Sequence, residues 1–233
     1  MTLLIISGVV LGLSLFVETF GFFLRSAGSS MALSSLGYSL HVQLATISRL
    51  GTFIGMPLVG FLLDSGTDPK TVSILPLMVS GIFIVCAVIT LYASTRVEKF
   101  SVWLFLFMGR NISKLDVPCD GKRANPTEIS ASEEAMLFWL SFLSHIIIVV
   151  GFYLMIILAS IFNDWRVTLM QSTPLLTAAG TLISVIYFDP RASTLIDKSI
   201  NPFRVTHIIM RARCTSMASI LLISGLLSVF LHV

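Results

Sequence analysis

Near its start the chain reads LLIISGVVLGLSLFVETFGFFL over residues 3–24, with Glu18 as the single charged side chain of the stretch. A helix needs roughly 20 consecutive, mostly apolar residues to cross a hydrocarbon core of about 30 Å. The stretch meets that length, and its apolar residues do not alternate with polar ones as they do in a half-buried strand. Residues 3–24 therefore predict a transmembrane helix.

Further apolar stretches along the chain define the expected fold. We expect membrane spans at residues 3–24, 35–63, 72–93, 135–161, 167–188 and 214–231. Only 12% of the 233 residues are charged, whereas a soluble domain carries about a quarter charged residues. The net charge of +3 is too small to indicate nucleic-acid binding. The chain is expected to be an all-α integral membrane protein, a single membrane domain over residues 1–233 with about six transmembrane helices.

Two segments depart from a simple span. Residues 35–63 carry four residues that are unusual in a membrane helix: Arg49, Gly51, Gly55 and Pro57. Because proline removes a backbone hydrogen bond, we expect this helix to be kinked or broken. The segment Phe100–Gly109 is apolar but too short to cross, so we place it in the membrane interface, within a loop over residues 94–134.

Lys and Arg side chains collect on one side of the predicted spans. That side carries Arg25, Arg96, Lys99, Arg110, Lys114, Lys122, Arg123, Arg191, Lys198, Arg204, Arg211 and Arg213. The opposite side carries Lys70 and Arg166. Cytoplasmic loops are enriched in Lys and Arg. The ratio of twelve such residues on one side to two on the other therefore predicts a cytoplasmic loop at residues 94–134 and both termini outside. The loop divides the chain into two three-helix halves, which run oppositely through the membrane.

The first span carries a polar face. Its members recur at helical spacing and are Ser7, Ser14, Glu18, Gly21, Arg25 and Gly28. A charge in mid-span costs roughly 2.5–3.5 kcal/mol on insertion scales, so Glu18 needs a partner or water. Two interpretations stay open: Glu18 lines a cavity, or it pairs with Arg25 at the interface.

The second span carries a polar stripe that must face protein or water, because lipid offers no hydrogen-bond partner. Its members are Ser34, Ser35, Tyr38, His41, Ser48, Arg49 and Thr52. The Arg49 guanidinium keeps its proton and forms paired hydrogen bonds with phosphate or carboxylate oxygens. Either Arg49 binds an anionic ligand, or it forms a structural ion pair with Glu18.

Motifs of known catalytic sites do not occur in the sequence. There is no nucleotide-binding loop, no HExxH and no GxSxG, and the three cysteines lack metal-ligand spacing, so neither a metal nor a cofactor is expected. His145 in the fourth span is more typical of an interhelical hydrogen bond than of a proton carrier. Arg211 and Arg213 are expected to anchor the last helix at lipid head groups. A membrane enzyme stays open, because a His, a Glu and an Arg can meet in space without a sequence signature.

Several of these residues belong to a longer pattern. It comprises Glu18-Thr19, Arg25-Ser26-Ala27-Gly28, Ser48-Arg49, Pro57-Leu58-Val59-Gly60 and Asp64, then Arg166-Val167-Thr168, Gln171, Asp189-Pro190, Ser193 and Asp197. In order and spacing the pattern resembles the Amj family of lipid II flippases, described as an alternate to MurJ. The departures from the family pattern are Phe22, Ser29, Ser30, Thr52 and Gly55.

The resemblance implies a flippase that moves lipid II from the inner to the outer leaflet of the bacterial cell membrane for peptidoglycan synthesis. With the polar stripes, it marks as substrate-binding Arg49, Arg25, Glu18, Ser48, Thr52, Tyr38, His41, Arg166, Gln171 and His145. The departures leave another polyprenyl-linked lipid open as the substrate. Two other classes also stay open: a membrane-embedded enzyme acting on polyprenyl-phosphate lipids, and a subunit of an envelope complex. A homodimer is left open.

Overall fold

A computed structural model describes residues 1–72, 74–112 and 127–230. Within these ranges the chain is helical and contains no strand. Six helical segments are long and apolar enough to cross a membrane: Thr2–Ser30, Ser34–Asp64, Ile74–Tyr92, Ala131–Ile161, Arg166–Lys198 and Pro202–Gly225. The expected fold class is confirmed, and the chain is a multi-pass, all-α membrane protein.

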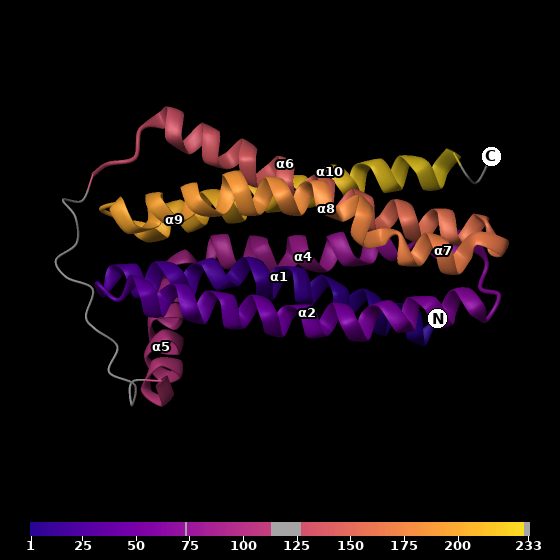
Figure 1. Cartoon of the computed structure of the whole chain (residues 1–233), viewed down its shortest axis with the longest axis horizontal. Coiled ribbons are helices and arrows are strands. Elements are labelled where there is room, and N and C mark those ends of the chain that lie inside the picture. The colour runs from indigo at the N-terminus through magenta and orange to yellow at the C-terminus, as the bar shows by residue number, and fades with distance from the viewer. Residues whose placement is uncertain (73, 113–126, 231–233) are drawn as a thin grey trace.

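The long helices lie side by side along the long axis of the molecule (Figure 1). They are α1 (Thr2–Ser30), α2 (Ser34–Asp64), α4 (Ile74–Tyr92), α6 (Ala131–Ile161) and α10 (Pro202–Phe230). The start of α1 and the end of α10 lie at one end of the bundle, called here the terminal end. The turn between α1 and α2 lies at the opposite end, called the loop end. The short α3 (Pro69–Val72) precedes α4 at the terminal end.

Helices α1 and α2 form a hairpin that packs through glycines. A Cβ atom at Gly28 would lie 2.5 Å from the Cα of Gly37, which shows how closely the two backbones approach. A Cβ at Gly55 would lie 2.7 Å from the Leu11 side chain, and one at Gly51 would overlap Ser14. These glycines therefore serve helix packing, and the expected break is absent because α2 is continuous through Pro57.

The interruption occurs in the fifth span instead. This span consists of η1 (Asn163–Trp165), α7 (Arg166–Gln171), α8 (Thr173–Ile183), the π-helical turn η2 (Ser184–Phe188) and α9 (Asp189–Lys198). Helix α7 ends at Gln171, and α8 begins with a proline in its first turn. Inside α-helices, π-helical turns are rare and occur often at functional sites. The span continues ten residues beyond its expected end at Phe188, since α9 ends at Lys198.

Helix α5 (Ser94–Ile112) lies across the bundle axis at the loop end (Figure 1). The rings of Phe100, Trp103 and Phe107 stack along it at 5.7 and 5.6 Å and are exposed. Residues 100–109, which the sequence predicts in the membrane interface, are part of this 19-residue helix. Residues 113–126 of the expected loop lie outside the described residues.

Helix α10 begins at Pro202, twelve residues before the expected start of the last span at Cys214. The sequence predicts the first part of α10 at the membrane surface because this part contains several charged residues. Arg213 is buried in the bundle, with 5% of its surface exposed, so its expected role as a head-group anchor is wrong.

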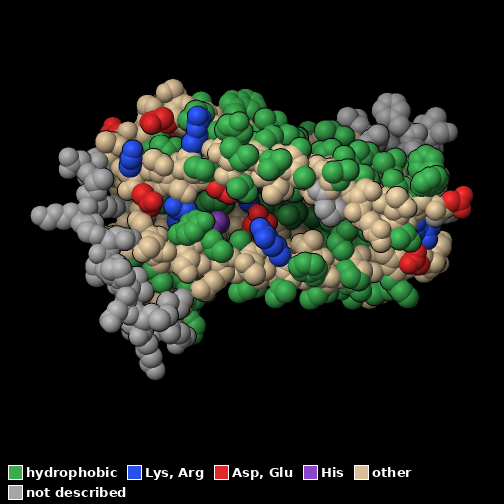
Figure 2. All heavy atoms as spheres, viewed as in Figure 1, with side chains coloured by type: hydrophobic (Ala, Val, Ile, Leu, Met, Phe, Trp, Pro, Cys, Tyr) green, Lys and Arg blue, Asp and Glu red, His purple; other side chains and the backbone are tan. Residues whose placement is uncertain are grey.

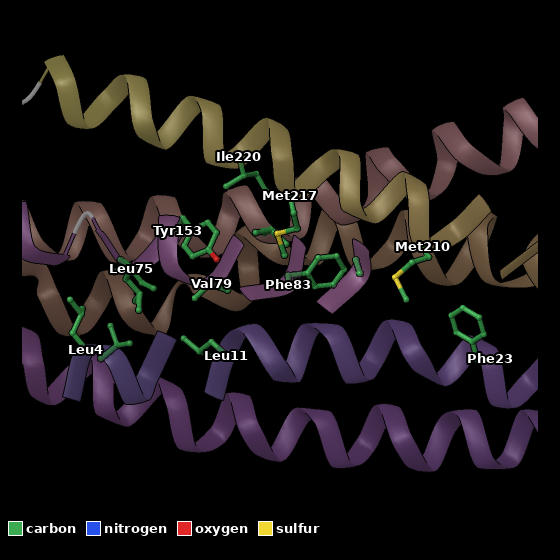
Figure 3. Close-up of a cluster of buried hydrophobic side chains, with 14 of the residues drawn as sticks. Leu4, Leu11, Phe23, Leu75, Val79, Phe83, Tyr153, Met210, Met217 and Ile220 are labelled. Atoms are coloured by element: carbon green, nitrogen blue, oxygen red, sulfur yellow. The ribbon is translucent and has the colours of Figure 1, made fainter. Parts of the chain in front are cut away.

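The apolar core lies between α1, α4, α6 and α10 (Figure 3). Phe23 of α1, Phe83 of α4, Tyr153 of α6 and Met217 of α10 all contribute to it, so both halves of the chain build one core. Helix α2 packs mainly against α1, and α8 packs mainly against α6. The space between α2 and the interrupted fifth span holds the candidate site.

Candidate functional site

Three cavities lie between α2 and the fifth span. The polar cavity, nearest the loop end, has a volume of about 530 Å³ and is lined by residues such as Arg25, Tyr38, His41, Asp189 and Arg213. The middle cavity measures about 420 Å³ and is lined by residues such as Leu11, Thr52, Phe152 and Thr177. The terminal cavity measures about 340 Å³ and lies between α2 and α7. Figure 2 shows this face, where acidic, basic and histidine side chains meet in a hollow between apolar surfaces.

The three cavities adjoin one another along α2 and are together called the groove. The polar and middle cavities share Glu18 and Arg49. The middle and terminal cavities share Met56 and Met170. Along α2 the lining runs from Tyr38 to Asp64, roughly 39 Å at 1.5 Å per residue. The groove is therefore longer than a hydrocarbon core of about 30 Å.

Arg49 lies at the centre of this groove. It is fifteen residues from each end of α2 (49 − 34 and 64 − 49), and it lines both the polar and the middle cavity. Within the described residues no hydrogen bond or ion pair of its guanidinium is found, and its side chain is exposed. The alternative structural pair with Glu18 is thus not formed among the described residues. Arg49 is thus an exposed cation in mid-span that lines both cavities.

Glu18 lies nearest to a different arginine. Arg213 of α10 is 4.0 Å from Glu18 and donates a hydrogen bond to the Thr19 hydroxyl at 3.1 Å. Its guanidinium also lies over the rings of Phe22 and Phe188, at 5.3 and 5.7 Å. These contacts fix Arg213 in the floor of the polar cavity. The helix-start signal of Pro202 after Asn201 could have indicated that Arg213 lies inside a span.

Arg25 forms the outer part of the same floor. It is buried, it donates to Asp197 of α9 at 3.5 Å, and its guanidinium lies 4.9 Å from the centre of the Tyr38 ring. His41 packs its ring 4.4 Å from that of Phe22. Arg25, Tyr38 and His41, which the sequence analysis marks as substrate-binding, all lie in the lining of the polar cavity.

The π-helical turn brings a second acid to the cavity. Ser184 lies in η2 and Asp189 directly follows it, and both line the polar cavity opposite α2. The lining contains three arginines and two carboxylates, Glu18 and Asp189, while Asp197 pairs with Arg25 from beside the cavity. Arg49 is the arginine of this lining without an acidic partner among the described residues, so it is the group that can attract an anion.

Other predicted residues lie elsewhere. Ser48 is buried and donates to the Ala45 carbonyl at 2.7 Å, and it lines none of the three cavities. His145 is buried 2.5 Å from the Ser216 hydroxyl, as in an interhelical hydrogen bond, so its assignment to the substrate site has no support. Arg166 and Gln171 line the terminal cavity, far along the groove from the polar one.

Comparisons with protein-family models, with curated proteins and with solved structures found no match to this chain. Its class therefore follows from its own fold and groove. The chain is a multi-pass helical membrane protein with a groove along its membrane-spanning helices, and the arginine at the groove's midpoint has no ion-pair partner in the described part of the chain.

Proposed function

We propose that the protein is a lipid flippase that moves a polyprenyl-pyrophosphate lipid, lipid II, from the inner to the outer leaflet of the bacterial cell membrane. The observation that carries the proposal is Arg49, an arginine in mid-span that lines the groove without a partner among the described residues. The resemblance to lipid II flippases supplies the particular substrate.

The cost of holding Arg49 in mid-span supports an anionic ligand. A charge there costs roughly 2.5–3.5 kcal/mol on insertion scales unless it is hydrated or paired. A guanidinium pairs with two phosphate oxygens at once, which a point charge cannot do. A pyrophosphate held by Arg49 would therefore offset this cost at the depth where hydrocarbon opposes a charged head group most strongly.

Apolar edges of the groove support a substrate with a lipid tail. Val42 of α2 and Val185 of η2 line the polar cavity from opposite sides and are 43% and 57% exposed. Such exposed apolar edges suit lipid chains, so the polyprenyl tail would stay in the bilayer while the head group travels in the groove. A water-soluble anion would need no apolar edge.

The direction of transport follows from charge. With Arg25 and Arg213 counted inside the bundle, ten Lys and Arg residues (12 − 2) still stand against two, so the loop end is assigned to the cytoplasm. A potential that is negative inside favours export of an anion by about 2.3 kcal/mol per charge and 100 mV. Two charges on the pyrophosphate would gain about 4–5 kcal/mol, so ATP is not required in principle.

The experiment is transport by the purified protein in vesicles, alongside complementation of cells depleted of their main lipid II flippase. Flipping of fluorescent lipid II above the rate of empty vesicles, together with growth rescue, is the expected result. Rescue without flipping by the pure protein, together with a co-purifying partner, would favour a subunit role. Release of phosphate from the lipid would favour a membrane-embedded enzyme. If the protein flips only a different polyprenyl-linked lipid, that lipid is the substrate in place of lipid II.

A further inference from the structure

The ion pair between Asp64 and Arg166 differs from the other charged contacts of the groove. Arg213 of α10 contacts Glu18 of α1, and Arg25 of α1 contacts Asp197 of α9, so neither of these ion pairs includes a residue of α2. Asp64 is the last residue of α2, and Arg166 is the first of α7, so their 3.2 Å contact joins the two walls across the terminal cavity.

The geometry of Arg166 presents donors to the groove. Its Nε donates to the Ala159 carbonyl of α6 at 3.4 Å, which anchors one edge of the guanidinium. Its Nη1 donates to Asp64. The Arg166 side chain is only 18% exposed, whereas that of Asp64 is 72% exposed. The arginine is thus held in place, and the carboxylate is the member of the pair that can leave for water.

A carboxylate and a phosphate accept the same paired hydrogen bonds from a guanidinium. The carboxylate of Asp64 therefore occupies the position that a phosphate oxygen of a travelling head group would take. Gln171 lines the same cavity and offers an amide as a further donor. Arg49 lies at the groove's midpoint and Arg166 at its terminal end, so the groove offers successive positions for one anion.

Resting on the proposed function, we infer that Arg166 is the release-side anion site of the groove. The Asp64 carboxylate is its resident ligand, which closes the terminal end until a lipid pyrophosphate displaces it. In the described conformation this ion pair joins α2 to α7 at the terminal end, the end from which a substrate would leave.

Closure is tested first, without any lipid substrate. A single reporter cysteine, Thr52→Cys, is placed in the middle cavity of a variant whose native cysteines are serines, and its reaction with a membrane-impermeant thiol reagent is measured from the terminal side. Asp64→Asn and Arg166→Gln should each raise the labelling rate about two- to fivefold, the effect of losing an exposed ion pair. The charge-reversed pair Asp64→Arg/Arg166→Asp should return the rate to that of the parent.

The matched control breaks a pair outside the groove. Glu134 accepts from Arg204 at 2.6 Å between α6 and α10 at the loop end, so Glu134→Gln should leave the labelling rate unchanged. An unchanged rate in Asp64→Asn, or an equal rise in the control, would overturn the closure of the groove by this pair.

Flipping then tests the anion site. Arg166→Gln should slow lipid II flipping at least fivefold, whereas the control Glu134→Gln should retain it, because only the arginine lies on the path of the head group. Equal losses in both variants would overturn the release-side site. If the parent protein flips no lipid, the proposed function fails, and the labelling rates still decide whether the pair closes the groove.

Discussion

Replacing Arg49 should weaken substrate binding about a hundredfold while leaving the fold intact. Its guanidinium has no hydrogen bond or ion pair among the described residues, so Arg49→Ala should change the free energy of unfolding by no more than about 0.5 kcal/mol. A hydrogen bond to a charged group contributes about 1.5–3 kcal/mol. Two such bonds to a pyrophosphate give at least about 3 kcal/mol, so the Kd for lipid II should rise roughly a hundredfold.

The conservative variant separates charge from geometry. Arg49→Lys keeps the charge but loses the planar fork, so one of the two hydrogen bonds should be lost. That loss is about 1.5 kcal/mol, and the Kd should rise about tenfold. The assays are the melting temperature in detergent, equilibrium binding of fluorescent lipid II, and flipping in vesicles.

A matched control and a double variant give the refuting results. Arg211 lies on α10, exposed and in a separate cavity at the loop end, so Arg211→Ala should bind lipid II as the parent does. Binding by Arg49→Ala within twofold of the parent would refute the assignment of Arg49. Normal flipping by the double variant Glu18→Gln/Arg49→Gln would also refute this assignment. If the two residues formed only a structural ion pair, removing both charges together would restore function.

Further variants test the floor of the groove, the packing of the hairpin and the topology. Glu18→Gln should remain folded and flip more slowly, and full activity over a broad pH range would exclude a role for the carboxylate charge. Arg213→Gln should lower the free energy of unfolding by about 2 kcal/mol, because a charged hydrogen bond to Thr19 and two ring contacts are lost, and thermal melting in detergent measures it. Gly28→Ala should destabilise by about 1–3 kcal/mol, since its Cβ would meet the α2 backbone, whereas Gly60→Ala, with open space around it, should not destabilise the protein. Thiol labelling should find Cys119 accessible from the cytoplasm and terminal tags accessible from outside, and a cytoplasmic C-terminus would contradict the assigned orientation.

The sequence determined the membrane fold because the length of an apolar run is a local property that can be compared directly with the bilayer thickness. The predicted spans at residues 3–24 and 135–161 lie within helices α1 and α6. The spacing of Tyr38, His41 and Arg49 predicts the face of α2 that lines the groove. Helical periodicity tells which side chains share a face, and this requires no knowledge of the rest of the chain.

Tertiary structure decided what each polar face meets. Arg213 and its partner Thr19 are 194 residues apart, and no local pattern distinguishes an arginine buried against α1 from one at the membrane surface. Likewise, the spacing around His145 could not tell that its partner is Ser216 of α10 and not a ligand. Hydropathy therefore underestimated α10, in which Arg213 is held inside the bundle by Glu18 and Thr19 of α1. The groove itself arises from the way α2 and the interrupted fifth span stand on a core built by both halves, a relation that only packing between distant segments defines.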